Sequence, residues 1–209
     1  TVLGLLDGKA AGHLWYGYGR KQPKPLANFG EVYTAPEHRG KGVCEALLNE
    51  FEAHFRSSPS PASFCTCGEE HVQKLYARHG FRTVIPEAKF GPLIFSKEPA
   101  RAAFDDFAAD YYASPGPLTA EPGSISYRHE TECLLKFDRN KHHIPSEFAF
   151  AANLANGYFS GFYELLHMQQ DCRGAIYHAL TADKRCVGWG FVMELFGTAD
   201  SFPVVDYQI

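Results

Sequence analysis

The residues with the clearest chemical potential lie between Glu31 and Cys44, where the chain reads Glu-Val-Tyr-Thr-Ala-Pro-Glu-His-Arg-Gly-Lys-Gly-Val-Cys. An apolar strand pattern and a proline come first, and a helical pattern begins near Val43, directly after the two glycines. Glycines at this spacing allow a tight turn and let a ligand approach the backbone without a Cβ in the way. A helix starting there points its unpaired N–H groups and the positive end of its dipole at the turn. The stretch therefore predicts a backbone cradle for a phosphate or pyrophosphate.

The composition narrows the class of protein that carries this cradle. The chain has 209 residues, of which 45% are hydrophobic and 21% charged, as in ordinary globular proteins. A formal net charge of -4 gives no support for nucleic-acid binding. No apolar run approaches membrane-spanning length, and the N-terminus shows no signal-peptide pattern, so we expect no membrane association. A homo-oligomer is left open.

Six cysteines are spread through the chain, and Cys65-Thr66-Cys67 contains the only close pair. No second Cys/His pair follows at zinc-finger spacing, so the pattern does not favour a metal site. We interpret the cysteines as buried, reduced thiols. Reduced thiols favour a reducing compartment, and we expect a cytoplasmic protein.

The first half of the chain predicts the element order β-β-β-α-β-α-β-β. The clearest element is a helix over Val43–Phe55, where apolar residues recur at every fourth position. Asp7-Gly8-Lys9 predicts the turn of a hairpin over Thr1–Tyr18, and Gly80 predicts a helix C-cap. The remaining predicted elements are strands at Leu26–Thr34, Ala62–Cys67, Phe81–Ile85 and Phe90–Phe95, and a helix at Glu69–His79.

The second half predicts a helix over Ala100–Tyr112, a Pro/Gly-rich linker over Pro115–Gly123 and a strand over Tyr127–Phe137. A long helical region from Pro145 to about Gln170 follows. The last predicted elements are strands at Ile176–Leu180, Val187–Phe196 and Val204–Ile209.

A weak internal sequence similarity (the internal repeat) relates the two halves of the chain. The segment from Asp7 to Gly12 aligns without a gap with the segment from Asp183 to Gly188, and strand-turn-strand-loop-strand follows both. We therefore predict a first domain over residues 1–97, a helix and linker over 98–124, and an incomplete second unit of the same kind over 125–209.

Two motifs together indicate a family. Pro36–Val43 resembles the acyl-CoA pyrophosphate loop of the GNAT superfamily of acetyltransferases. Leu75–Arg82, with the sequence Leu-Tyr-Ala-Arg-His-Gly-Phe-Arg, resembles that family's second signature, Leu-Tyr-x-x-x-Gly-Phe. The resemblance covers about Thr1–Lys97, which lacks the family's first strand and the helices after it. It implies an α/β fold with a mixed, mostly antiparallel sheet flanked by helices, here with a partial second copy.

The resemblance also implies roles for individual residues. Backbone N–H groups of Arg39, Gly40, Lys41, Gly42, Val43 and Cys44 would hold the pyrophosphate of acetyl-CoA, used as a cosubstrate. Main-chain groups of Val32, Tyr33 and Thr34 would bind the pantetheine arm as an added strand. Tyr76 stands where the family has its general acid. The implied function is an N-acetyltransferase that transfers an acetyl or other acyl group to a small-molecule or peptide amine, with no metal.

An acyl transfer of this kind also requires a general base and a hydrogen-bond donor for the oxyanion. The amine must lose a proton before it attacks the thioester, and the resulting oxyanion needs a hydrogen-bond donor. Glu31 is our candidate base, directly or through water, and an exposed strand carboxylate is its alternative reading. Tyr76 has an alternative reading as a core aromatic residue.

Two departures from the family pattern favour a rival function. The family usually has Gln or Arg where this chain has Glu37, and often Asn where it has Glu69. A carboxylate beside a pyrophosphate is unfavourable unless it points away. The rival is a degenerate, non-catalytic acyl-CoA-binding or regulatory module. A nucleotide-binding phosphate loop is a third option, although its Gly-x-x-x-x-Gly-Lys-Ser/Thr pattern is absent.

Overall fold

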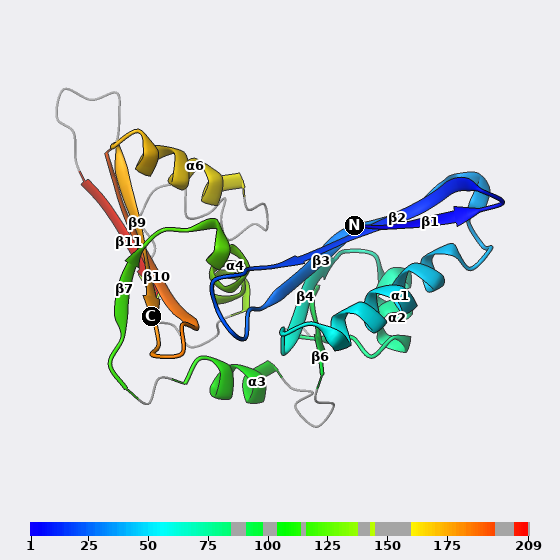
Figure 1. Ribbon diagram of the computed structural model, residues 1–209, viewed down its shortest axis with the longest axis horizontal. Coiled ribbons are helices and arrows are strands. Elements are labelled where there is room, and N and C mark those ends of the chain that lie inside the picture. Colours follow the sequence, from blue (N-terminus) through cyan, green and yellow to red (C-terminus); the bar gives the residue numbers. More distant parts are fainter. Residues whose placement is uncertain are drawn as a thin grey trace. The chain divides into compact units, whose positions relative to one another are not determined.

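The computed structural model describes residues 1–84, 91–97, 104–113, 116–137, 143–144, 160–194 and 203–208. The chain divides into two compact units, each with its own sheet (Figure 1). The first unit comprises Thr1–Tyr18 and Leu26–Asp106, and the second comprises Gly19–Pro25 and Phe107–Ile209. The short segment Gly19–Pro25, which separates two strands of the first sheet, is thus counted with the second unit.

The first unit is built on a sheet with the strand order β1-β2-β3-β4-β6-β5. Neighbouring strands are antiparallel except for β3 and β4, which are parallel. The strands are β1 (Val2–Leu6), β2 (Lys9–Tyr18), β3 (Ala27–Thr34), β4 (Ala62–Cys67), β5 (Arg82–Thr83) and β6 (Gly91–Ser96).

Helices α1 (Val43–Ser57) and α2 (Glu70–Arg78) pack on this sheet and share one hydrophobic core with it. The apolar residues predicted at every fourth position of α1 lie on its buried face: Leu47, Phe51 and Phe55 are each at most 2% exposed. Phe51 stacks on Phe29 of β3 with ring centroids 4.9 Å apart. This aromatic core fixes both helices against the strands and so positions the loops at their ends.

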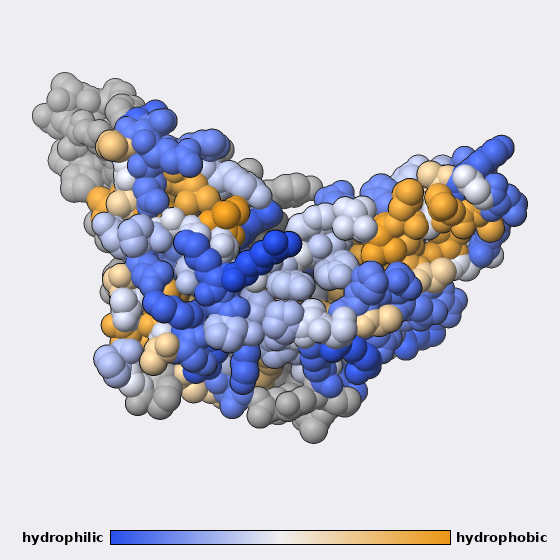
Figure 2. All heavy atoms as spheres, in the orientation of Figure 1, coloured by the Kyte–Doolittle hydropathy of each residue, from blue (hydrophilic) through white to orange (hydrophobic). Residues whose placement is uncertain are grey.

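Hydrophobic surface gathers over the β1–β2 hairpin (Figure 2), where Leu3 and Leu5 are 59% and 62% exposed. Their neighbours Val2, Gly4 and Leu6 are half-buried, as strand alternation requires. Val2 packs against the core with α1, so Leu3 and Leu5 lie on the other face of the hairpin.

The second unit has its own sheet, with the strand order β7-β9-β10-β11-β8 and antiparallel pairing throughout. Its strands are β7 (Thr119–Pro122), β8 (His143–Ile144), β9 (Gly174–Leu180), β10 (Cys186–Glu194) and β11 (Pro203–Gln208). Its helices are α3 (Phe104–Tyr111), which spans the boundary between the units, the 3₁₀ turn η3 (Ile125–Tyr127), α4 (Arg128–Phe137) and α6 (Ser160–Gln170).

The predicted fold class is confirmed as mixed α/β, with a mostly antiparallel sheet flanked by helices. The partial second copy stays a prediction, as do the predicted domain boundaries. The two aligned segments of the internal repeat lie in comparable elements. In each half, three consecutive strands, β1-β2-β3 and β9-β10-β11, pair as antiparallel neighbours.

Two sequence predictions in the second half were wrong. The strand expected over Tyr127–Phe137 is mostly the helix α4. Its inward residues, Tyr127, Glu130, Thr131 and Leu134, follow helical spacing, and two of them are polar. The expected linker contains β7, which pairs with β9 from Thr119 to Pro122. Parts of the expected elements, at residues 85–90, 98–103, 145–159 and 195–202, lie outside the described residues.

None of the helices among the described residues is long and apolar enough to cross a membrane.

Candidate functional site

The turn between β3 and α1 has the geometry that its glycines predicted. Gly40 and Gly42 adopt φ values of 74° and 78°, in the left-handed region that favours glycine. Nothing lies within 4 Å of the Cβ that either glycine would carry. The preceding 3₁₀ turn η1 (Pro36–His38) ends where the Arg39 N–H donates to the Pro36 carbonyl at 3.2 Å. Because that N–H is used inside the turn, the open part of the cradle begins at Gly40.

The start of α1 adds unpaired donors to the cradle. The Ala46 N–H donates to the Gly42 carbonyl at 2.9 Å, which closes the first turn of the helix. The N–H groups of Val43 and Cys44 therefore have no acceptor within the helix. They lie at the positive end of a helix of 15 residues. The side chains of Arg39 and Lys41 are exposed beside them, so the local charge favours an anion.

Strands β3 and β4 separate soon after they meet. Their parallel ladder joins only Ala27 to Ser63 and Asn28 to Phe64, although β3 runs on to Thr34 and β4 to Cys67. On its other side β3 pairs with β2 as far as Thr34, and β4 pairs with β6 as far as Cys67. Each strand thus has one paired and one unpaired edge beyond Asn28, which leaves main-chain donors and acceptors open to an extended ligand.

A bulge in β3 lies within this separated region. Between the pairs of β2 with Gly30 and Tyr33, β3 has one residue more than its partner, and Glu31 adopts a φ of 51°. The Glu31 side chain is exposed, whereas Val32 packs against the hydrophobic core. Tyr33 is 46% exposed, and its ring lies 5.6 Å from that of His13. The Thr34 carbonyl accepts a hydrogen bond from Arg39 Nε at 3.3 Å, which ties the strand to the turn.

Tyr76 is the buried polar side chain of α2. It is 6% exposed and lies between Phe29 and Phe81, with ring centroids 5.4 and 5.6 Å away. Burial raises the pKa of this hydroxyl well above its usual range, and three nearby thiols, those of Cys65, Cys44 and Cys67, raise it further. The group is therefore protonated at neutral pH.

The structure brings some of the predicted residues together and leaves others apart. Tyr76 and Cys44 meet in the same core cluster, which also contains Val32 and Val43 at its edge. Glu31 is exposed on the part of β3 that does not pair with β4. Glu37 and Glu69, the departures from the family pattern, are both exposed.

Sequence reasoning missed two features near this site. Cys67 is half-buried beside Tyr76, whereas we had expected a fully buried thiol. The strand alternation of Cys65 and Cys67 was the available signal, because it places both thiols on one face. His38, in η1, has a buried Nδ1 without a partner among the described residues.

The thiols differ widely in exposure. Cys65, Cys133 and Cys186 are buried, Cys44 and Cys67 are half-buried, and Cys172 is exposed. None of them forms a disulfide. Among the described residues, no group of three or more His, Cys, Asp or Glu side chains is arranged to hold a metal ion.

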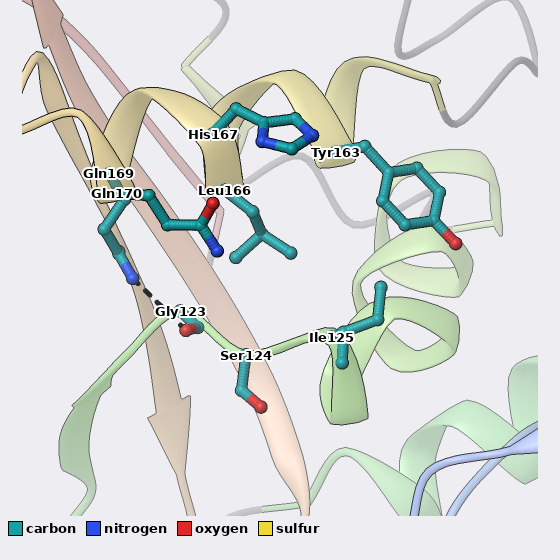
Figure 3. A pocket seen from close by; sticks show the side chains of 8 residues that line it. All are labelled: Gly123, Ser124, Ile125, Tyr163, Leu166, His167, Gln169 and Gln170. Atoms are coloured by element: carbon teal, nitrogen blue, oxygen red, sulfur yellow. Dashed lines mark hydrogen bonds between the residues drawn. The ribbon is translucent and has the colours of Figure 1, made fainter.

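A separate cavity of about 310 Å³ lies in the second unit (Figure 3). Gln169 bridges its wall, donating to the Gly123 carbonyl at 3.3 Å and accepting from the Ile176 N–H at 3.0 Å. No carboxylate lines it, so it offers no counter-charge to an ammonium group. The lining residues come from α6 and the start of η3: Gly123, Ser124, Ile125, Tyr163, Leu166, His167, Gln169 and Gln170.

The interior of the second unit holds a polar network. Thr131 donates to the Tyr127 carbonyl at 2.8 Å, and its hydroxyl lies 3.1 Å from His178 Nε2. Gln22 donates through Nε2 to the fully buried Glu130 carboxylate. Burial lowers the pKa of His178 to about 4, so its ring is neutral at pH 7.

Comparison with known proteins finds one family model that matches residues of the first unit. Residues 3–83 match the family model described as acetyltransferase (GNAT) domain. No curated protein matches the chain.

Several solved structures resemble the chain at low identity. A putative GNAT acetyltransferase from Desulfovibrio desulfuricans is 21% identical, with a TM-score of 0.37, over 46% of this chain and 66% of that one. The Bacillus subtilis N-acetyltransferase YlbP, solved with coenzyme A, is 17% identical, with a TM-score of 0.33, over 44% and 65%. A GCN5-related N-acetyltransferase from Kribbella flavida is 15% identical, with a TM-score of 0.36, over 95% and 44%. The chain thus spans less than two thirds of each of these structures.

The matched residues run from β1 to β5 and contain both the glycine turn and Tyr76. Residues 3–83 of this chain are therefore similar to the GNAT acetyltransferase domain.

Proposed function

We propose that the first unit is an N-acyltransferase that moves an acyl group, acetyl first among the candidates, from acyl-CoA to a primary amine. The observation that carries the proposal is the early separation of β3 and β4 next to the glycine turn. Separation opens strand edges, and the turn supplies anion-binding N–H groups at one end of them. A ligand with a pyrophosphate joined to a long amide-containing arm matches both features.

The binding half of the proposal uses main-chain groups. The N–H groups from Gly40 to Cys44 bind the pyrophosphate, and Arg39 contributes charge through its side chain, since its N–H is already used. The pantetheine amides bond to the unpaired edge formed by Val32, Tyr33 and Thr34, as an added strand would. This mode needs few side chains, which is why exposed carboxylates at Glu37 and Glu69 are compatible with it.

The chemical half uses the bulge and Tyr76. The amine attacks the thioester carbonyl once it is neutral, and Glu31 takes its proton directly or through water. An N–H turned outward at the bulge donates to the oxyanion. The C–S bond then breaks, and Tyr76 gives its proton to the departing thiolate. Its raised pKa keeps that proton in place at neutral pH, so the hydroxyl can donate to the departing thiolate.

The acceptor is a small-molecule or peptide amine. A test uses acetyl-CoA with a panel of amines that spans polyamines, aminoglycosides, amino acids and peptides, and follows the release of free CoA. Binding of desulfo-CoA, which lacks the sulfur, is measured separately by calorimetry. The proposal requires both binding and amine-dependent release of CoA.

A second candidate is the non-catalytic acyl-CoA-binding module. The exposed Glu37 and Glu69 favour it, because both stand where the family usually has uncharged or basic side chains. It predicts that desulfo-CoA binds while no amine in the panel accelerates release of CoA. Replacing Glu37 with Gln and Glu69 with Asn distinguishes the two further, since restored turnover would show that these residues alone prevent catalysis.

A further inference from the structure

Apolar side chains that the fold leaves open border the cavity of the second unit. Ile125 and Tyr163 are 48% and 44% exposed, although both are large hydrophobic residues. Figure 3 shows Leu166 pointing from α6, and Ile125 pointing from η3, into the space between these two elements. Apolar surface gathered around a cavity indicates a ligand site, whereas exposed apolar residues scattered singly do not.

Tyr163 is held in place at one side of the cavity. The guanidinium group of Arg128 lies 5.0 Å from the centre of the Tyr163 ring, and Arg128 Nη1 donates to the Tyr163 hydroxyl oxygen at 2.8 Å. A cation over one face of an aromatic ring stabilises the position of that ring. Because the hydroxyl oxygen already accepts this bond, the hydroxyl hydrogen is the group left to interact with a ligand.

Other acceptors along the wall are also engaged within the protein. The Gly123 carbonyl accepts from Gln169 Nε2 at 3.3 Å, and Gln169 Oε1 accepts from the Ile176 N–H at 3.0 Å. Ser124 Oγ accepts from the Ser126 N–H at 3.3 Å. The Ser124 hydroxyl hydrogen and the second amide hydrogen of Gln169 remain as donors. The wall therefore offers a ligand more donors than acceptors.

Two exposed polar side chains, His167 and Gln170, complete the lining. The Gln170 carboxamide turns toward Leu166 (Figure 3) and brings two further N–H donors, along with one acceptor. No Asp or Glu lines the cavity. An ionised carboxylate accepts hydrogen bonds and donates none, so it complements a wall that is rich in donors and free of acidic groups.

We propose that this cavity binds a small aromatic carboxylate. The ring of the ligand packs against Ile125, Leu166 and the Tyr163 ring, and its carboxylate lies at the polar rim beside His167 and Gln170. The volume of about 310 Å³ is at the lower end of small-molecule sites, which limits the ligand to one ring with a short polar arm. All lining residues belong to the second unit, so the proposal does not depend on the acyl-transfer function.

The test titrates para-fluorobenzoate into the full chain and follows its fluorine NMR signal. We expect saturable binding. The neutral para-fluorobenzamide should bind at least about tenfold more weakly, because it lacks the charge that strengthens hydrogen bonds from the wall. The cationic para-fluorobenzylamine should bind more weakly still. Equal affinity for all three probes would indicate unselective apolar binding and would overturn the proposal.

Gln170→Glu tests the charge of the rim with a nearly unchanged shape. It places a carboxylate beside that of the ligand and should weaken para-fluorobenzoate about tenfold, but para-fluorobenzamide less than about twofold. Tyr163→Ala removes one wall and should weaken both ligands about tenfold. Tyr177→Ala is the matched control, since Tyr177 is 48% exposed on β9 of the same unit and does not line the cavity.

The remaining outcomes locate the probe. If para-fluorobenzoate does not bind at millimolar concentration, or if its affinity is unchanged by both Gln170→Glu and Tyr163→Ala, the proposal is wrong. Excess desulfo-CoA should leave the probe bound. Displacement by desulfo-CoA in a protein whose affinity neither variant changes would assign the probe to the acyl-CoA site instead. Each of these failures leaves the proposed function standing, because that function is tested by desulfo-CoA binding and release of CoA.

Discussion

The two units place their buried polar groups differently. In the second, Thr131 lies between the Tyr127 carbonyl and His178, and Gln22 bonds the buried Glu130. In the first, Tyr76 is buried among aromatic rings, those of Phe29 and Phe81. The strands differ as well, because β9 and β10 pair at seven positions and the parallel strands β3 and β4 at two. Polar groups that bond each other stabilise a fold, whereas strand edges that are left unpaired are available to a ligand.

The largest expected effect comes from removing the Tyr76 hydroxyl. Tyr76→Phe should lower kcat by about 10²–10⁴-fold, the usual contribution of a general acid, with binding of desulfo-CoA unchanged. Stability should change by less than about 1.5 kcal/mol, the usual net contribution of one hydrogen bond. Steady-state kinetics and urea unfolding check both points. Tyr16→Phe is the control, since it removes a hydroxyl that bonds His54 at the surface. Equal turnover in both variants would remove the proposed acid.

Acid should weaken the second unit more than the first. Burial lowers the pKa of His129 and His178 to about 4, below the 6.5 of an unperturbed histidine. The unfolded state therefore binds protons more readily, and the stability that is present above pH 6.5 is lost as the pH falls toward 4. The loss is roughly 1.4 kcal/mol per pH unit for each histidine in this window.

Urea unfolding between pH 7 and pH 4.5, followed by signals from each unit, measures this slope. His178→Gln should make it shallower, while the exposed His54→Gln should not. A slope unchanged by His178→Gln would mean that the buried ring does not control the acid response.

Closing the glycine turn should weaken the anion site, with a smaller energetic effect. Gly42→Val places a β-branched residue at a φ of 78°, which is strained, and fills the open space of the cradle. We expect desulfo-CoA to bind about 10–100-fold more weakly, or roughly 1.4–2.8 kcal/mol. Gly8→Val is a matched control, because Gly8 has a φ of 76° and open space but lies in the β1–β2 turn. If Gly8→Val weakens binding as much, general strain and not the cradle explains the loss.

The last expected effect concerns the polar network of the second unit and leaves CoA binding unchanged. Thr131→Val leaves His178 Nε2 without its hydroxyl partner and should destabilise the second unit by about 1–3 kcal/mol. Affinity for desulfo-CoA should not change. The exposed Thr119→Val, on β7 of the same unit, should cost little. Thermal unfolding of both variants gives the comparison, and equal melting temperatures would show that the network contributes no stability.

The sequence predicted the elements whose residues carry their own signal. Helix α1 was predicted from apolar residues at every fourth position. The glycine turn was predicted from two glycines, the residues that adopt positive φ values most easily. Helix α4 was missed because Glu130 and Thr131 occupy inward positions where apolar residues are expected. Strand β7 was missed because a strand with Pro122 and little apolar content is recognised only through its partner β9. The early separation of β3 and β4 depends on pairing and has no local signature.

The bulge at Glu31 determines how a deletion would affect the side-chain pattern of β3. Before it, the inward side chains of β3 are the buried Ala27 and Phe29, and after it they are the half-buried Val32 and Thr34. The extra residue shifts the alternation of inward and outward side chains by one position. Deleting Glu31 would remove the extra residue, so regular alternation would keep Val32 inward and Tyr33 outward, and only the bulge would be lost. A deletion at this position is therefore compatible with the packing of the strand end, although it removes the irregularity in the backbone.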